Sequence, residues 1–322
     1  MRVLVTGVYG FIGSYFTKYL LSMDPFVQII GFGRHSSMYD HQRLGNKPSS
    51  RLKIVFGDLS EPAHVSGLCE NIDVVVNFAA KTFVDHSLKD RAPFITSNII
   101  GADNLMEDAT RYGVKCFVQV STDEVYGQIL TGAYKEDAEL QPRNPYSWSK
   151  ACADLDAIQR HRTYGFPVIV TRTENNFGPY QHRQKALPTF VRCALADEPI
   201  PVYGDGLHVR CWLHVEEHCR AICHLINRAL VVGEPVFGQI FHIAGEEEMT
   251  NLQLAKCVLA TLNKPADRVK HIDDHNIRPG HDRRYALDCS KLKATGFTIR
   301  QDLPILLTQT INWYKDHPGW TR

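Results

Sequence analysis

Short apolar runs alternate with amphipathic stretches through the first half of the chain. Val3–Thr6 has the character of a buried strand, and an apolar stretch with helical spacing runs from about Phe11 to Leu21. Further runs predict the strands Val27–Gly31, Ile54–Phe56, Val74–Phe78, Cys116–Ser121 and Val168–Thr171 and the helices Pro93–Tyr112 and Pro145–Tyr164. This alternation predicts an α/β fold built on a doubly wound parallel sheet.

The pattern loosens after about Phe177, where prolines and glycines interrupt the apolar runs. We expect residues 1–176 to form the first domain. A helix over Val215–Leu230 is expected to return to that domain and bring about 211–240 with it. Residues 177–210 and 241–322 are expected to form a smaller, interleaved C-terminal domain that binds the substrate.

The first strand leads into a glycine-rich turn with the spacing G-x-x-G-x-x-G. Gly7, Gly10 and Gly13 allow a tight turn and a close approach to a diphosphate, whose charge the start of the following helix favours. A plain strand-to-helix turn is the alternative. We interpret the segment as the dinucleotide-binding turn of a Rossmann-type sheet, with Phe11 and Ile12 beside the cofactor.

The end of the second strand indicates which dinucleotide to expect. An NAD-binding unit usually carries a carboxylate there for the ribose 2′-hydroxyl, but this chain has none in the run from Gly31 to Ser37. Arg34, Ser36 and Ser37 suit a 2′-phosphate, so we expect NAD(P), tightly bound, with NADP favoured over NAD. From Arg34 to Lys53 the chain has five Lys or Arg residues and one acid, and the alternative is that this basic run is only a solvated loop.

Two further strands end in residues expected beside the cofactor. Asp58-Leu59 and Ala79-Ala80-Lys81 follow their strands at the edge where doubly wound sheets bind ligands. Asp58 suits the adenine amino group, although a turn or cap role is equally compatible with its position.

Two motifs carry candidate catalytic chemistry. Tyr146 and Lys150 lie four residues apart and therefore on one face of a helix, where a nearby ammonium favours the phenolate that can take a hydroxyl proton. Thr122, Asp123 and Glu124 directly follow a strand. Two adjacent carboxyl groups suit paired acid–base work, because their repulsion separates their pKa values. A helix N-cap with first-turn acids is the alternative.

Composition excludes several classes of protein. The 322 residues carry a formal net charge of +1, from 36 Lys and Arg against 35 Asp and Glu, so nothing indicates a nucleic-acid partner. No apolar run approaches the ~18 residues of a membrane helix. Nine cysteines without framework spacing suggest reduced thiols and a cytoplasmic location. The run from Cys211 to Cys219 contains His214 and His218, but we expect no metal there.

These motifs resemble the extended short-chain dehydrogenase/reductase family, and within it the NDP-sugar 4,6-dehydratases such as the dTDP-glucose 4,6-dehydratases. The resemblance covers nearly the whole chain, and the Thr-Asp-Glu triplet is its specific part. It rests on segments Val5–Gly13, Ser121–Gly127, Asn144–Lys150, Asn175–Gln181, Pro201–Gly206 and Arg278–Tyr285.

The resemblance implies roles for individual residues. Tyr146, helped by Lys150 and Thr122, takes the proton of the sugar 4-hydroxyl as hydride leaves C4. Glu124 takes the C5 proton, Asp123 protonates the departing 6-hydroxyl, and the hydride returns to C6. The implied contacts with a nucleotide-diphosphate sugar are Phe83, Thr122, Asn175, Asn176, Lys185, Arg210, Arg278, His281, Arg283 and Tyr285.

Other activities and departures from the pattern bear on the assignment. A 4-epimerase or decarboxylase of the same family, or a silent NADP-binding regulator, are the alternatives, although epimerisation needs no elimination acid. Six residues depart from those usual in the family, so the sequence does not identify the nucleotide base or the hexose of the substrate. These are Phe83, His86, Trp148, Glu174, Cys211 and His214. The resemblance also suggests a homodimer through the helices Pro93–Tyr112 and Pro145–Tyr164.

Overall fold

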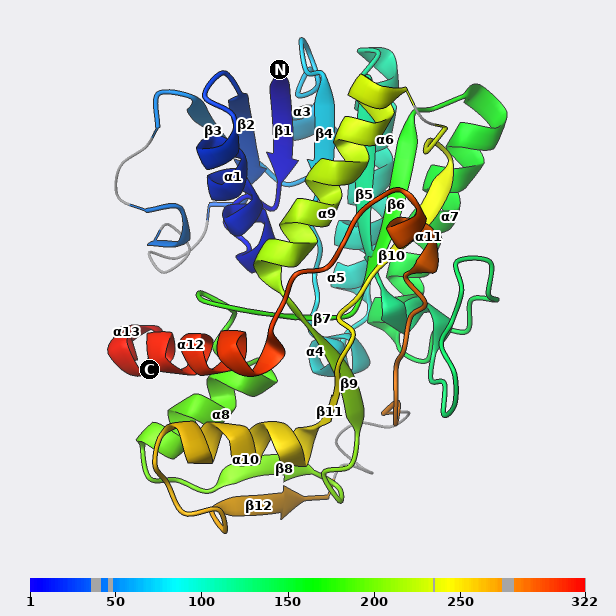
Figure 1. Cartoon of the computed structure of the whole chain (residues 1–322). Coiled ribbons are helices and arrows are strands. Elements are labelled where there is room, and N and C mark those ends of the chain that lie inside the picture. Colours follow the sequence, from blue (N-terminus) through cyan, green and yellow to red (C-terminus); the bar gives the residue numbers. More distant parts are fainter. Residues whose placement is uncertain (36–41, 46–48, 234, 274–280, 322) are drawn as a thin grey trace.

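A seven-stranded parallel sheet forms the centre of the larger domain (Figure 1). The computed structural model describes residues 1–35, 42–45, 49–233, 235–273 and 281–321. The strand order is β10-β6-β5-β4-β1-β2-β3, and every neighbouring pair is parallel. The strands are β1 (Arg2–Thr6), β2 (Gln28–Gly33), β3 (Leu52–Phe56), β4 (Val74–Asn77), β5 (Cys116–Thr122), β6 (Val168–Thr173) and β10 (Gln239–Ile243).

Helices cover both faces of this sheet, as the alternation predicted. Val3 and Val5 of β1 pack into one apolar cluster with α1 (Phe11–Met23) and α9 (Val215–Asn227). Leu4 packs into the opposite cluster with α6 (Gly101–Arg111) and α7 (Pro145–Tyr164). Successive strand residues point to opposite faces, so a run buried on both sides is apolar throughout. The expected doubly wound α/β fold is confirmed.

The expected helix Pro93–Tyr112 is divided into three parts. It consists of α5 (Ala92–Phe94), the π-helical η1 (Ile95–Ile100) and α6. Helix α7 begins where expected, because the Asn144 side chain accepts a hydrogen bond from the Ser147 amide and Pro145 occupies the first turn. It ends at Gly165, which adopts a φ of 70°.

The smaller domain has two short sheets and its own apolar core. One sheet has the order β11-β9-β7, and the other pairs β12 with β8. Trp212, Leu254 and Leu307 belong to the core that joins these strands to the helices. The elements are β7 (Asn175–Phe177), β8 (Ile200–Tyr203), β9 (Val209–His214), β11 (Glu248–Thr250), β12 (Val269–Ile272), α8 (Ala186–Leu195), α10 (Asn251–Thr261) and α12 (Leu303–Asp316).

The two domains are interleaved more finely than the sequence indicated. Strand β10 continues the large sheet to Ile243, past the expected boundary near residue 240. Leu292 of α11 (Ser290–Ala294) and Phe297 pack into the core of the large sheet. The remaining short elements are α3 (Pro62–Val65), α4 (Val84–Lys89), η2 (Asp123–Tyr126), η3 (Arg228–Val232) and α13 (Pro318–Thr321).

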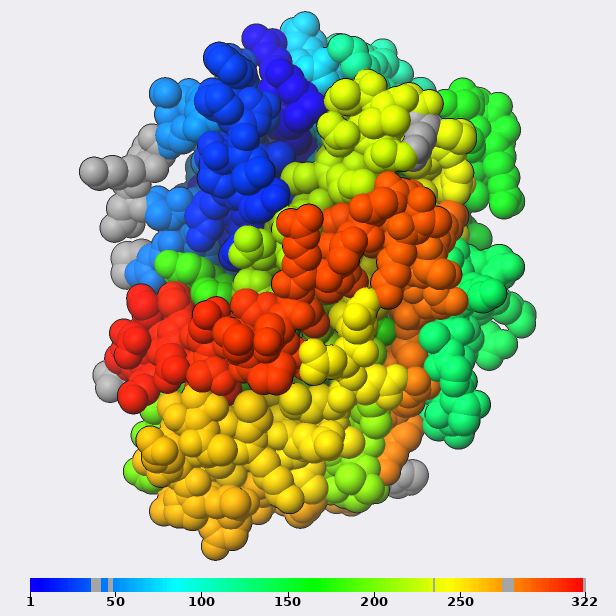
Figure 2. Space-filling model, in the orientation of Figure 1, coloured from blue at the N-terminus to red at the C-terminus, as the bar shows by residue number. Residues whose placement is uncertain are grey.

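The C-terminal helices lie between the domains. Figure 2 shows them in red, between the N-terminal α/β part in blue and the small domain in yellow and orange. All nine cysteines are free thiols. Across the described ranges, no helix is both long and apolar enough to cross a membrane.

Candidate active site

The glycine turn closes tightly against the end of β4. Gly7 has a φ of +62°, and a Cβ there would lie 2.9 Å from the Ala79 nitrogen. A Cβ on Gly13 would lie 2.4 Å from the Gly7 carbonyl oxygen. Only glycine fits these positions, and the first residues of α1, Phe11, Ile12 and Gly13, line a cavity where a helix N-terminus favours a diphosphate.

Two cavities meet at this turn. The rear cavity is lined by Gly33, Arg34, Asp58 and Leu59, among others. The central cavity is lined by Phe11, Ile12, Gly13 and the catalytic candidates Thr122, Asp123, Glu124, Tyr146 and Lys150. Both are lined by Gly7, Gly10, Arg43, Phe78 and Ala80. The arrangement fits a dinucleotide whose adenosine half occupies the rear cavity and whose nicotinamide half occupies the central one.

Most expected cofactor contacts line these cavities, with three exceptions. Ser36 and Ser37 lie outside the described residues. Lys81 lines neither cavity, and its backbone amide instead donates to Asn98 Oδ1 at 2.8 Å. Asp58 lines the rear cavity and also has the turn role, because its Oδ1 accepts from the Ser60 amide at 3.0 Å and hydroxyl at 2.8 Å.

Thr122 joins the expected base to the expected acid. Its hydroxyl donates to Asp123 Oδ1 at 3.0 Å and shares a hydrogen bond with the Tyr146 phenol. Lys150 lies one helical turn after Tyr146, with its Nζ donating to the Val120 carbonyl at 2.6 Å. The end of β5 and the first turns of α7 therefore bring the catalytic candidates into one cluster.

Burial sets the protonation of this cluster. Burial and the neighbouring Glu124 raise the pKa of Asp123 to about 7, so this carboxyl holds a proton far better than an exposed one. Burial lowers the pKa of Lys150 to about 8, and Asp154 opposes that shift. Burial also raises the pKa of Tyr146 above its usual value, with a further rise from Glu124. Asp123 therefore suits the role of a general acid.

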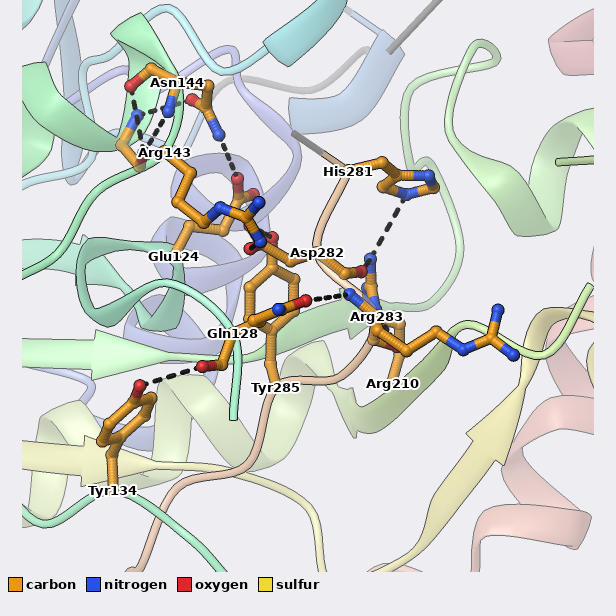
Figure 3. Close-up of polar contacts among 11 residues, drawn as sticks. Glu124, Gln128, Tyr134, Arg143, Asn144, Arg210, His281, Asp282, Arg283 and Tyr285 are labelled. Carbon is orange, nitrogen blue, oxygen red and sulfur yellow. Dashed lines mark hydrogen bonds and ion pairs between the residues drawn. The ribbon is translucent and has the colours of Figure 1, made fainter. Parts of the chain in front are cut away.

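Glu124 lines both the central cavity and a third, outer cavity. The Asn144 side-chain amide points at Glu124 and donates to its Oε2 at 3.2 Å (Figure 3). The expected substrate contacts that line the outer cavity are Phe83, Asn175, Lys185, Arg210, His281 and Tyr285. Asn176 and Thr122 line the central cavity.

The segment after residue 280 forms one wall of the outer cavity. Asp282 accepts from Arg143 at 2.9 Å and from the Tyr285 hydroxyl at 2.7 Å, and its carbonyl accepts from Arg210 at 2.8 Å. Arg283 is not in the lining and pairs with Asp205 at 2.6 Å. Arg278 lies outside the described residues.

Two departures from the family pattern contact each other. Glu174 and Cys211 are both buried and share a side-chain hydrogen bond. Strand pairing places Thr173 opposite Thr122, so Glu174 follows beside Asp123. Burial and Asp123 raise the pKa of Glu174 well above its usual value, and burial and Glu174 raise that of Cys211. The chain therefore adds a second buried acid next to Asp123.

Other departures lie near the mouth of the site. Phe83 contacts His182, with ring centroids 4.7 Å apart, and the Lys185 ammonium lies 4.8 Å from the Phe83 ring centre. Trp148 lines none of the three cavities, is 37% exposed and has the Arg91 guanidinium 5.2 Å from its ring centre.

Sequence reasoning missed Asn98. It is 2% exposed, lies in the π-helical η1, and its amide donates to the Lys81 carbonyl at 3.0 Å and to Ser149 Oγ at 2.9 Å. It thus ties the end of β4 to the residue before Lys150. Helical periodicity cannot reveal it, because a π segment shifts the face on which a residue falls.

The histidines of the Cys211–Cys219 run have other partners. His214 Nδ1 accepts from the Glu216 amide at the start of α9, and His218 Nδ1 is 3.0 Å from Asn176 Oδ1. No group of three His, Cys, Asp or Glu residues in the described part of the chain has a geometry that could hold a metal ion.

Comparison with known proteins assigns this site to a family. Residues 4–310 match the model described as GDP-mannose 4,6 dehydratase. The chain belongs to this family. A dTDP-glucose 4,6-dehydratase of Actinoplanes sp. is 40% identical over 99% of both chains. The expected class, an extended short-chain dehydrogenase/reductase of the NDP-sugar 4,6-dehydratase type, is therefore confirmed.

Solved structures agree in fold. DesIV, a dTDP-glucose 4,6-dehydratase from Streptomyces venezuelae solved with NAD bound, is 38% identical, with a TM-score of 0.91 over 99% of this chain and 98% of its own. A UDP-glucuronic acid 4-epimerase from Bacillus cereus is 25% identical, with a TM-score of 0.89 over 98% of this chain and 100% of its own. The scaffold therefore serves more than one reaction, and the acids at the end of β5 bear on which one applies.

Proposed function

We propose that the protein converts an NDP-hexose, of the dTDP-glucose type, to the NDP-4-keto-6-deoxyhexose. The observation that carries this proposal is the buried Asp123 beside Glu124, with a pKa of about 7 that suits proton donation to a departing hydroxyl. An epimerase needs no such acid. The relatives named dTDP-glucose 4,6-dehydratase support the same substrate class.

Tyr146 begins the proposed reaction by taking the proton of the sugar 4-hydroxyl. Burial raises the pKa of Tyr146 and opposes this step, so the phenolate would have to be favoured by the Lys150 ammonium, one turn along α7, together with the positive charge of an oxidised nicotinamide. A nicotinamide dinucleotide, when bound, accepts the hydride from C4 and later returns it to C6. Thr122 holds Tyr146 and Asp123 through one hydroxyl, which fixes both groups toward the same sugar.

The two carboxyl groups then eliminate water. Glu124, oriented by the Asn144 amide, takes the C5 proton that the 4-ketone has acidified. Asp123 gives its proton to the 6-hydroxyl as the C6–O bond breaks, and water leaves. Glu124 returns its proton to C5 when C6 has received the hydride, which completes the 4-keto-6-deoxy product. The proton that Tyr146 took from the 4-hydroxyl then passes to Asp123 through Thr122, which contacts both groups, and the cycle closes.

The fate of the C4 hydrogen tests this proposal. Substrate carrying deuterium at C4 is expected to give product with that deuterium at C6, measured by mass spectrometry and NMR after incubation with dTDP-, UDP-, CDP- and GDP-hexoses. Loss of the label to solvent, or product of unchanged mass, would overturn the proposal. The nucleotide that gives turnover identifies the base.

The cofactor form is a separate proposal. The described end of β2 carries Gly33, Arg34 and His35 without a carboxylate, and the Arg34 guanidinium lies beside the rear cavity, 3.7 Å from Asp58. We infer that NADP is accepted in preference to NAD, although relatives such as DesIV were solved with NAD. Denaturing the purified protein and weighing the released dinucleotide decides this, because NADP is heavier by one phosphate. Release of NAD alone contradicts the inference.

We also propose a homodimer in the cytoplasm. Ile100 at the end of η1, together with Leu155 and Tyr164 on α7, exposes apolar side chains at the helices expected to pair. A second copy that covers them would form a four-helix bundle. Nine free thiols and a substrate made from nucleotides both suit a reducing cytoplasm.

A further inference from the structure

Arg43 lies where the two halves of the cofactor cleft meet. It lines both the rear and the central cavity, and so do Gly7 and Gly10 of the glycine turn. A dinucleotide that spans both cavities must pass its diphosphate between that turn and this guanidinium. Arginine binds phosphate oxygens through paired, charge-assisted hydrogen bonds, which a carbonyl or an aliphatic side chain cannot supply.

The guanidinium is fixed from two sides of the cleft. Arg43 is only 5% exposed, and its NH1 group donates to the Tyr9 carbonyl within the glycine turn at 2.8 Å. Its Nε donates to the Tyr180 carbonyl at 3.1 Å. These two bonds orient the arginine along the cleft and join the glycine turn to the segment after β7.

Tyr180 has an unusual backbone conformation at this contact. Its φ of 67° lies in the left-handed region, which a residue other than glycine adopts at a cost of about 1 kcal/mol or more. Its ring packs against Trp313 and Trp320, with centroids 4.5 and 5.3 Å away. The aromatic packing holds the turn that presents the Tyr180 carbonyl to Arg43.

The last helix completes the arrangement. The Trp320 ring lies over the Arg43 guanidinium at 4.9 Å, and its indole N–H donates to the Gln181 carbonyl at 2.9 Å. Gln181 itself lines the central cavity. Figure 1 shows α13 below α1, on the side of the large sheet where the glycine turn lies. The end of the chain is therefore packed against the cofactor cleft.

We propose that Arg43 binds the diphosphate of the dinucleotide and that Trp320 is the positioning residue that holds it there. The C-terminus of the chain thereby retains the cofactor. The reason for retention rests on the proposed function. In that reaction the reduced dinucleotide must stay bound between oxidation at C4 and hydride return to C6. The contacts themselves require only that a dinucleotide bind.

Cofactor exchange tests the proposal without any nucleotide sugar. The full-length protein, loaded with dinucleotide, is mixed with an excess of isotopically labelled dinucleotide, and the bound fraction is weighed over time. Arg43→Ala is expected to speed dissociation about ten- to a hundredfold. Trp320→Ala is expected to speed it by a smaller factor, whereas Trp320→Phe keeps an aromatic face over the guanidinium and stays near the wild-type rate.

Arg51→Ala is the matched control. Arg51 also donates to two backbone carbonyls, those of Asp24 and Leu21, but it lines neither cavity. It is expected to change melting temperature and leave the exchange rate unchanged. Wild-type exchange in both Arg43→Ala and Trp320→Ala overturns the proposal, as does equal acceleration in Arg51→Ala. If the wild-type protein retains the dinucleotide as expected but dehydrates no nucleotide sugar, the result counts against the proposed function and leaves this inference standing.

Discussion

Burial of a residue in this site affects both its protonation and the stability of the fold. Asp123 is 5% exposed, and burial together with Glu124 raises its pKa to about 7. A raised pKa means that the folded state binds the proton more tightly than the unfolded state, so stability is lost as pH rises from about 4 to about 7. Asp123, the proposed acid of the elimination, is therefore a source of instability at neutral pH and above.

Asp123→Asn should expose this cost. At pH 8 the variant should be more stable than the wild type by on the order of 2 to 4 kcal/mol, because it removes a buried charge and keeps the acceptor for Thr122. At pH 5 the difference should fall to about a third of that value, because most of the loss of stability occurs between pH 5 and pH 7, and elimination should be lost at both pH values. Chemical denaturation at the two pH values measures the difference in free energy of unfolding. The exposed Asp137→Asn is the control, and an equal effect at both pH values would contradict the assignment.

Glu124→Gln separates oxidation from elimination. Tyr146 and Lys150 remain, so oxidation at C4 should proceed and reduced nicotinamide should accumulate. Product formation should fall about a hundredfold or more, the usual contribution of a general base. Rapid-scan absorbance follows the nicotinamide, and mass spectrometry follows the product. Normal turnover by this variant would remove Glu124 from its role.

At the scale of elements, helix α7 connects folding to chemistry. Asn144 caps its first turn through Ser147 and also donates to Glu124. Tyr146 and Lys150 follow on the same helix, and Asn98 reaches Ser149 from η1. The start of one helix thus sets the positions of Tyr146 and Glu124, the two groups proposed to remove protons from the sugar.

Substitution of Asn144 can separate these two effects. Asn144→Ala should lower stability by about 1 kcal/mol, the usual value of an N-cap, and should lower kcat about tenfold through Glu124. Asn144→Ser should recover the stability, because serine also caps, but its shorter side chain should leave kcat low. Thermal unfolding and steady-state kinetics give the two values. Recovery of both by serine would show that Asn144 acts through the helix alone.

On the scale of the whole molecule, exposed apolar side chains on α7 bear on assembly, and the interleaving of the two domains bears on unfolding. Leu155 is 59% exposed and Tyr164 is 71% exposed on α7, beside η1 and α6. The large domain is completed by β10 and by residues around α11, which follow segments of the small domain in the sequence. The two domains are therefore linked by several chain crossings. Such a chain is expected to unfold as one unit.

Leu155→Asp tests the proposed pairing of copies. A charge at the centre of a four-helix interface should dissociate the dimer, because it cannot be buried without a partner. Sedimentation at micromolar concentration should then report a monomer. Phe26→Asp is the control, since Phe26 is 84% exposed at the far end of the sheet and should leave the assembly unchanged. A monomeric wild type would overturn the proposal of a homodimer.

The sequence by itself determined six of the seven strands of the large sheet, the glycine turn and the positions of the catalytic candidates, but not the edge strand β10. These are local signals, because strand alternation, glycines at fixed spacing and two residues four apart on a helix all follow from backbone geometry. The link between Thr122 and Tyr146 was implied by the family resemblance, and the fold accounts for it because β5 ends where α7 begins.

Tertiary structure alone decided the rest. Arg43 contacts Tyr9, Tyr180 and Trp320, which lie 34, 137 and 277 residues away, and the sequence showed it only as one of several basic residues after β2. The pairing of Glu174 with Cys211 and the position of Asn98 likewise depend on which strands and helices pack together. Burial and long-range contact set the charges and partners of these side chains, and neither quantity is a property of a short stretch of sequence.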